Sequence, residues 1–314
     1  MTLVADAHNP AQDDVLAALA AHPAERPVFD AGLRAELRAT LEDHLAATVP
    51  MLDTLGIDQL WVTKHDLSAV NGCEVRFLAE QEIGFDGWTV ARARGSVAHR
   101  AIELSMHVRG EPVPGDLVDE ALARLAAGDD SLADWLQTIS EADRAELRGV
   151  AVERVSSFLE LWPPLQARWR PRCESKAAAD LLDGRIHLTG KVDLAVGVAE
   201  GMRAGKVLVD LKTGGFSPSH LDDLRFYALV ETLKVGVPPR RVATHYLDTG
   251  KLVPEDVTEA TLASALRRVT DGVRRWLELR GPAAKPLLKP GAACRWCPVL
   301  DRCEEGRAMV HEHT

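Results

Sequence analysis

The chain has 314 residues, of which 46% are hydrophobic and 27% are charged, and its formal net charge is −10 at pH 7. This composition is ordinary for a globular protein with a sizeable core, and the length favours two domains or one core with a large insertion. The acidic balance argues against a non-specific nucleic-acid binder but leaves a nucleic-acid enzyme open, because such a partner could meet a local basic surface or a bound metal. The start of the chain carries no basic region followed by an apolar run, and no apolar run is long enough to span a bilayer. We therefore expect a cytoplasmic protein without membrane contact.

The first half of the chain is predicted to be helical. Residues 1–25 are rich in Ala and Asp without a strong period, which favours a mobile or loosely docked arm. Leucines at helical spacing predict one helix over 34–53, and similar patterns predict a helix–turn–helix over 65–82 and a helix over 93–108. Residues 115–170, rich in Ala, Leu, Asp and Glu, are expected to be helical throughout.

The pattern then changes to that of a mixed sheet. Segments 185–197 and 206–214 are β-like and are separated by a Gly-containing turn, so we expect an antiparallel pair. A helix with a Ser start and a Gly stop is predicted over 217–236, a strand with its turn over 241–253, and a long amphipathic helix over 257–280. This order predicts an α/β fold with a mixed central sheet flanked by helices.

These elements suggest three parts. We expect an N-terminal helical arm over 1–60, a core over 61–290 with a helical insertion near 115–170, and a cysteine-bearing segment over 291–314. A Pro- and Gly-rich linker over 281–293 leads into the last part.

Two aspartates and a lysine stand on the predicted strand pair. Asp210 and Lys212, in VDLKTG, are two residues apart and therefore share one face of their strand, and Asp193 lies on the partner strand in GKVDLAVG. Two carboxylates can hold Mg²⁺ or Mn²⁺, and a nearby lysine can orient or deprotonate a water molecule. The competing interpretation is an exposed ion pair at a sheet edge, which would contribute little.

The run GKVDLAVG…VLVDLKTG resembles the PD-(D/E)XK nuclease superfamily, and within it the RecB-like and AddB-like branch that includes CRISPR-associated exonucleases with an iron–sulfur cluster. The resemblance spans roughly residues 60–307 and implies a restriction-endonuclease-like core. It implies that Asp193, Asp210 and the backbone carbonyl of Leu211 bind Mg²⁺ or Mn²⁺, and that Lys212 activates the attacking water.

Two further motifs extend this resemblance. The upstream GSVAHRAIE matches the G-x-x-x-H pattern of the branch, which implies that His99 is a metal ligand. Tyr227, in DDLRFYALV, matches the tyrosine of the Q-x-x-x-Y motif and is taken as a catalytic-site residue. Asp223 stands where the family has Gln, which leaves the role of that position open. An ordinary helix histidine and a core tyrosine are the competing interpretations.

Five cysteines are present, and Cys294, Cys297 and Cys303 form a C-x2-C-x5-C cluster. Metal or cluster sites need four thiolates, and the residues alone leave Cys73 and Cys173 as candidates for the fourth. The family pattern matches LSAVNGCEVRFL and implies that Cys73 completes a [4Fe–4S] site, with Zn²⁺ as the alternative. Cys173 is then a spare.

The segment RWRPR contains Arg168, Trp169, Arg170 and Arg172, which we interpret as a nucleic-acid contact, with a solvated or core role as the alternative. The resemblance implies a Mg²⁺- or Mn²⁺-dependent deoxyribonuclease, preferentially an exonuclease on single-stranded ends, in DNA repair, recombination or foreign-DNA processing. No G-x-x-x-x-G-K-[ST] loop is present, so a helicase partner would be a separate chain. The alternatives are a DNA-binding scaffold subunit of the same fold and a zinc-stapled protein-interaction module.

Overall fold

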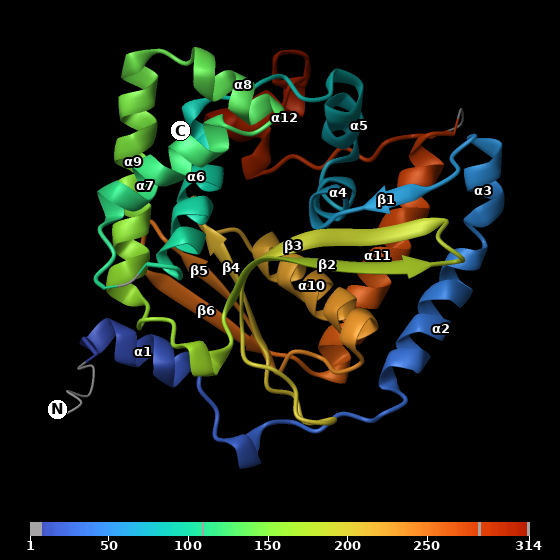
Figure 1. Cartoon of the computed structure of the whole chain (residues 1–314). Coiled ribbons are helices and arrows are strands. Elements are labelled where there is room, and N and C mark those ends of the chain that lie inside the picture. Colours follow the sequence, from blue (N-terminus) through green and yellow to red (C-terminus); the bar gives the residue numbers. More distant parts are fainter. Residues whose placement is uncertain (1–7, 109, 282–283, 313–314) are drawn as a thin grey trace.

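A mixed six-stranded sheet forms the centre of the computed structural model, which describes residues 8–108, 110–281 and 284–312 (Figure 1). The strand order is β1-β3-β4-β5-β6, and β2 pairs with the other edge of β3. The strands are β1 (Leu60–Val62), β2 (Arg172–Leu181), β3 (Ile186–Val196), β4 (Val207–Lys212), β5 (Arg241–Tyr246) and β6 (Lys251–Asp256). The α/β class with a mixed sheet is thus confirmed.

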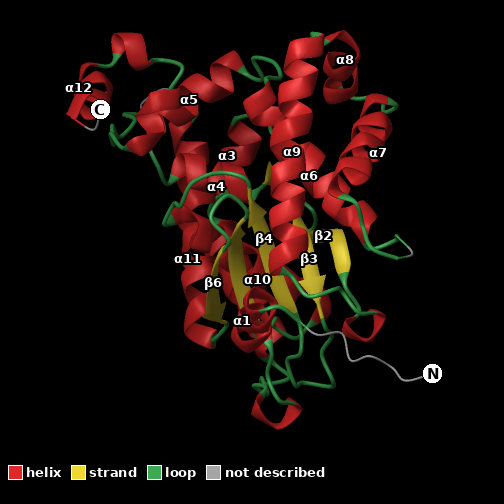
Figure 2. Ribbon diagram, turned by 90° about the vertical axis from the view of Figure 1, so that its left-hand side faces the viewer, coloured by secondary structure: helices red, strands yellow, loops and turns green. Residues whose placement is uncertain are grey.

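Helices cover both faces of this sheet (Figure 1 and Figure 2). Before the sheet and around it lie α1 (Pro10–Leu19), α2 (Leu33–Ala46), α3 (Val49–Thr54), α4 (Lys64–Val70), α5 (Glu74–Ile83), α6 (Val90–Ser105), α7 (Pro114–Ala126), α8 (Ser131–Thr138) and α9 (Glu141–Leu161). The later helices are α10 (Ser219–Val235), α11 (Glu259–Leu279) and α12 (Glu304–Glu312).

Two hydrophobic cores flank the sheet, and β4 shows how the sequence divides between them. Val207, Val209 and Leu211 are buried among residues of α6, α7 and α9, whereas Leu208 belongs to the core formed with α2, α10 and α11. Asp210 shares the face of Leu208 because side chains alternate along a strand. The charged residues of β4 therefore lie on the α10 side of the sheet.

Two predictions for the N-terminal region need correction. The helix expected over 34–53 is two helices, since α2 ends at Ala46 and a second helix, α3, begins at Val49. Pro50 lies in the first turn of α3, where the N–H that proline lacks would have no acceptor within the helix. The segment over 10–19, expected to be loosely docked, is the helix α1, in which Asn9 and Gln12 form a capping box and Val15 and Leu19 are buried. Residues 1–7 of the predicted arm lie outside the described residues.

The prediction of helix throughout 115–170 is also wrong at its C-terminal end. Helix α9 ends at Leu161, and Trp162 is followed by Pro163 and Pro164, which cannot continue a helix. Strand β2 was not predicted from its sequence, RCESKAAADL, because Ala is a helix former. Its backbone pairs with β3 along nearly its whole length, and this tertiary pairing overrides the local preference. Among the described residues, no helix combines the length and apolar character needed to cross a membrane.

Candidate active site and cysteine site

The candidate active site lies where β3 and β4 separate. Their backbone pairing stops at Leu194 and Val209, and Asp193 and Asp210 come next on the two strands. There the backbone N–H of Leu211 donates to Asp193 Oδ2 at 2.7 Å, so a carboxylate replaces the missing strand partner. Strand β1 reaches only Ile186–Leu188 of the same β3 edge, which leaves this gap open beside the aspartates.

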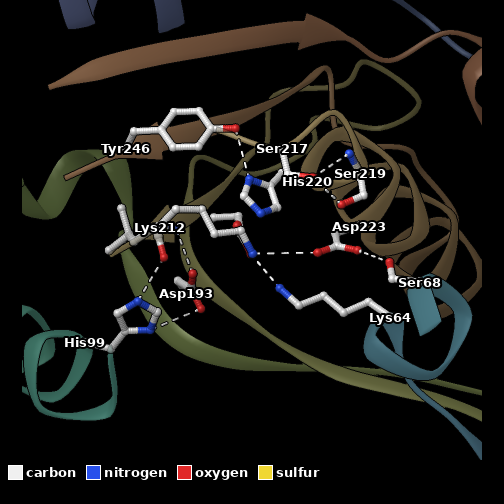
Figure 3. A network of polar contacts seen from close by, with 12 residues as sticks. Lys64, Ser68, His99, Asp193, Lys212, Ser217, Ser219, His220, Asp223 and Tyr246 are labelled. Carbon is white, nitrogen blue, oxygen red and sulfur yellow. Dashed lines mark hydrogen bonds and ion pairs between the residues drawn. The ribbon is translucent and has the colours of Figure 1, made fainter. Parts of the chain in front are cut away.

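His99 enters the gap from α6 (Figure 3). Its Nε2 is 3.0 Å from the carbonyl oxygen of Leu211, and its Nδ1 is 3.5 Å from Asp193 Oδ1 and 3.6 Å from Glu174 Oε1. Burial alone would lower the pKa of His99, but the carboxylates of Asp193 and Glu174 raise it to about 9. Both ring nitrogens face acceptors, so the imidazolium form satisfies all of these contacts.

Gly95, one turn before His99, lets α6 approach the end of β4. A Cβ on Gly95 would lie 3.4 Å from Thr213 Oγ1, at the close end of ordinary van der Waals contact. Gly95 and His99, four residues apart, thus share the face of α6 that meets the end of β4.

Glu174 is a site residue that the sequence reasoning missed. It lies on β2 between residues that pair with Leu194 and Val192, and it therefore stands opposite Asp193. Its φ of 48° is in the left-handed region, which is unfavourable for a residue with a Cβ. Once β2 is known to be a strand, the register alone would have identified this glutamate.

Asp210 is buried, at 2% exposure, between two lysines. Lys64 Nζ lies 2.6 Å from Asp210 Oδ1, and Lys212 Nζ lies 2.8 Å from Oδ2. Burial alone would raise the pKa of Asp210, but the two ammonium groups hold it below its usual value. Lys64, the first residue of α4, was also missed, because its segment signals only a helix N-terminus, capped by Thr63.

Asp223, on α10, holds Lys212 from the other side. Its Oδ2 is 3.6 Å from Lys212 Nζ, and its Oδ1 accepts a hydrogen bond of 2.8 Å from Ser68 Oγ (Figure 3). The position at which the sequence departs from Q-x-x-x-Y therefore carries a carboxylate that contacts the lysine of VDLKTG.

Tyr227 is buried, one turn further along α10. Its ring lies against Gly190 of β3, where a Cβ would come within 2.7 Å of the ring, and its centroid is 4.9 Å from Lys64 Nζ. Burial raises the pKa of Tyr227 to about 12, so the phenol is neutral near pH 7. These contacts give Tyr227 a packing role beside the lysines.

His220, in the first turn of α10, lies near Lys212 and Asp210. Its Nδ1 is 3.0 Å from the hydroxyl of Tyr246, the last residue of β5 (Figure 3). Burial and the nearby charge of Lys212 lower the pKa of His220. The imidazole is therefore neutral near pH 7.

The donor atoms of this site fit a hard divalent cation. His99, Glu174 and Asp193 each offer one ligand atom within 4.8 Å of the others, and they are the one such group among the described residues. Carboxylate oxygens with one imidazole suit Mn²⁺ or Mg²⁺ better than soft metals. Asp210 and the Leu211 carbonyl lie beside this group.

The four cysteines assigned to a cluster line one cavity of about 650 Å³ between α4, α5 and the C-terminal segment. Three of their sulfurs accept backbone N–H groups: Cys73 from Lys289, Cys294 from Gly291 and Cys303 from Gly306, at 3.5, 3.3 and 3.3 Å. Such donors stabilise thiolate charge. Cys173 lies elsewhere, 3.6 Å from Met106 Sδ, and burial raises its pKa to about 12.

Glu74, the residue after Cys73, holds the C-terminal segment in place. Its carboxylate accepts two hydrogen bonds from Arg275 of α11, at 2.7 and 2.6 Å, and one of 2.6 Å from the backbone N–H of Leu287. Arg76 adds a bond of 3.0 Å to the carbonyl of Ala293. These contacts bring the three late cysteines to the helix that begins after Cys73.

The basic segment before β2 does not join the aspartates. Arg168 and Trp169 form a short 3₁₀ turn, Arg170 follows it with left-handed backbone, and Arg172 begins β2 opposite Ala195. The arginines are exposed. This segment lies toward the start of β4, whereas Lys212 is at the end of that strand.

The chain was compared with known proteins. The family model of the PD-(D/E)XK nuclease superfamily matches residues 63–304. Curated proteins offer no match. A crystal structure named "Putative exonuclease" from Eubacterium rectale is similar, with a TM-score of 0.49 and 14% identity over 78% of this chain and 88% of that one. The structure of the protein SSO0001 gives a TM-score of 0.32 and 11% identity, over 71% of this chain and 99% of that one.

At these TM-scores and identities, neither structure supports a conclusion about this chain. The family assignment depends on the family model. The matched range includes both aspartates, Lys212 and His99, and it folds as a mixed sheet flanked by helices. The chain belongs to the PD-(D/E)XK nuclease superfamily.

Proposed function

We propose that this protein is a metal-dependent deoxyribonuclease that hydrolyses phosphodiester bonds, acting as an exonuclease on single-stranded ends. The observation that carries the proposal is the convergence of His99, Asp193, Asp210 and Lys212 in the gap between β3 and β4. His99 and Asp193, with Glu174, would hold Mg²⁺ or Mn²⁺, and Asp210 and the Leu211 carbonyl would complete the site. The bound cation would polarise a phosphoryl oxygen and lower the pKa of a water molecule.

The protein's own groups divide the remaining work. Lys212, held between Asp210 and Asp223, is placed to orient the attacking water and to offset the negative charge that develops on the phosphoryl group. Lys64 supplies a second positive charge at the same carboxylate. Tyr227 packs its ring against Gly190 and so helps to hold α10 against β3.

We also propose that Cys73, Cys294, Cys297 and Cys303 bind a [4Fe–4S] cluster, as in the RecB-like branch. The four cysteines line one cavity, and three of their sulfurs accept backbone N–H groups, which would stabilise bound thiolates. Zn²⁺ is the alternative, and a brown colour with absorption near about 400 nm would distinguish the cluster from a colourless zinc–thiolate site.

The test is digestion of end-labelled DNA by anaerobically purified protein. Single-stranded DNA, duplex DNA and single-stranded RNA are each incubated with Mg²⁺, Mn²⁺ or EDTA. We expect metal-dependent degradation of single-stranded DNA from one end, and loss of degradation in Asp210→Asn. Asp43→Asn, an exposed aspartate on α2, is the matched control and should retain activity. Degradation in EDTA, or full activity of Asp210→Asn, would contradict the proposal.

A further inference from the structure

A second cavity lies at the opposite end of β4 from the candidate active site. Its volume is about 400 Å³, and its lining residues come mainly from α1, the segment over 162–170 and the connection between β3 and β4. Val207 lines it at the start of β4, whereas Lys212 ends that strand. Five residues of strand, roughly 17 Å, therefore separate the cavity from the lysine.

Two arginines on the cavity wall lack an acidic partner. Arg240 is 7% exposed, and its guanidinium donates from Nη2 to the carbonyl of Leu19, at the C-terminal end of α1. The Nε atoms of Arg240 and Arg26 are buried and have no hydrogen-bond acceptor in the described part of the chain. No carboxylate of the described residues lies within 4.0 Å of either guanidinium: Glu200 of the cavity wall forms no ion pair with them, and the neighbouring Asp256 pairs with Arg241 at 2.7 Å.

The end of α1 compensates only part of this charge. A helix C-terminus carries about half a negative elementary charge, which Arg240 shares with Arg241 through the carbonyls of Leu19 and Ala18. Burial, together with the charges of Arg241 and Arg26, lowers the pKa of Arg240 to about 10. Buried cations are ordinarily paired, so this site favours an anion.

The remaining wall combines apolar and aromatic side chains with Arg168, Arg170 and the acidic Glu200. Trp162 and Trp169 both line the cavity, and Arg168 lies over the Trp169 ring, 5.9 Å from its centroid. Trp162 is buried, with its ring stacked on Phe158 and its N–H bound to His245 Nδ1 at 2.8 Å, so it is part of the wall and Trp169 is the residue placed to stack on a ligand. A cavity of this volume, with guanidinium groups and an indole face, has the size and the chemistry of a site for a mononucleotide.

We propose that this cavity binds one nucleotide, with the guanidinium groups of Arg26 and Arg240 on its phosphate and an indole face of Trp169 on its base. The nucleotide is either a free nucleoside monophosphate or the phosphorylated end of a strand, since both present the same groups. The proposal goes beyond the nuclease activity and does not depend on it. It gives Trp169 and its basic neighbours a ligand at a site separate from the aspartates.

Isothermal titration calorimetry with dAMP in EDTA tests the proposal without catalysis. We expect binding by the wild type, and affinity about tenfold to a hundredfold weaker in Arg26→Gln and Trp169→Leu, which lose a charge-assisted contact and a stacking contact. Arg34→Gln, an exposed arginine on α2, should bind like the wild type. Thermal melting confirms that each variant is folded, and Arg26 is partly exposed, so its replacement spares the core.

The source of the nucleotide follows from two further titrations, with a 5′-phosphorylated and a 5′-hydroxyl tetranucleotide. Tighter binding of the phosphorylated strand than of dAMP supports a strand end, and binding of dAMP alone supports a free nucleotide. The proposal is overturned if neither dAMP nor the phosphorylated strand binds at about 10 mM. It is also overturned if Arg26→Gln and Trp169→Leu bind as tightly as the wild type, whatever the result of the nuclease assay.

Discussion

The protonation of His99 predicts how metal binding responds to pH. In the metal-free protein both ring nitrogens face acceptors, and the pKa of His99 is raised to about 9. A metal ligand must be neutral, so the cation competes with a proton. At pH 7, two units below this pKa, only about one imidazole in a hundred is neutral. The apparent metal association constant should therefore rise about tenfold per pH unit until pH approaches 9.

Calorimetric titration of Mn²⁺ between pH 6 and 8, in buffers with different ionisation enthalpies, measures this linkage. We expect the affinity to rise with pH and about one proton to be released per ion bound at pH 7. His99→Asn should bind more weakly and lose most of the pH dependence. Equal pH dependence in wild type and variant, or no proton release, would refute this account of His99.

The raised pKa of His99 makes the metal-free protein less stable as pH rises, whereas metal binding becomes stronger. Because the folded-state pKa of His99 is above its unfolded value of about 6.5, the protonated side chain stabilises the fold fully below pH 6.5. The contribution is lost as pH rises through about 9. Denaturant unfolding in EDTA at pH 6 and pH 9.5 should show this loss in the wild type and a smaller one in His99→Asn.

Three further substitutions test the packing and the cysteine site. Gly190→Ala places a Cβ against the buried Tyr227 ring and should lower the free energy of unfolding by about 1–3 kcal/mol. Gly149→Ala, with open space around it, is the control and should be neutral or stabilising. Equal melting temperatures of the two variants would count against the packing role of Tyr227. Glu74→Gln should lower the free energy of unfolding by about 1–3 kcal/mol and lower the iron content, because Glu74 holds the C-terminal segment in place. An unchanged melting temperature and iron content would be inconsistent with this role. Cys297→Ser should lose the brown colour and absorption near about 400 nm and destabilise the fold, whereas normal colour with unchanged melting would exclude the cluster assignment.

The parts of the fold that were predictable follow local rules. The alternation in VDLKTG placed Asp210 and Lys212 on one face of a strand, and the strand pairing with the segment of Asp193 was expected from the turn between them. His99 was predicted as a site residue from a family motif, because the sequence of its helix does not indicate where α6 packs against the sheet. The helix over 93–108 was nevertheless close to α6 as observed.

The missed residues depend on contacts across the fold. Glu174 is in an Ala-rich segment that is a strand only because β3 pairs with it. Lys64 belongs to a helix start more than a hundred residues before Asp210, and no local pattern connects the two. The pairing of Asp223 with Lys212 likewise required the structure. Long-range electrostatic contacts of this kind have no periodicity in the sequence.

The central claim is that Lys212 acts in catalysis within an intact site, and one comparison tests it most directly. Single-turnover cleavage of end-labelled single-stranded DNA with Mn²⁺ is measured for the wild type, Lys212→Ala and the exposed-lysine control Lys234→Ala, with DNA affinity and melting measured in parallel. The account predicts that Lys212→Ala binds DNA and remains folded but cleaves at least about a hundredfold more slowly, as expected for the loss of general base or charge stabilisation, while Lys234→Ala cleaves normally. Cleavage by Lys212→Ala at the wild-type rate, or DNA binding without cleavage by any of the three proteins, would contradict it.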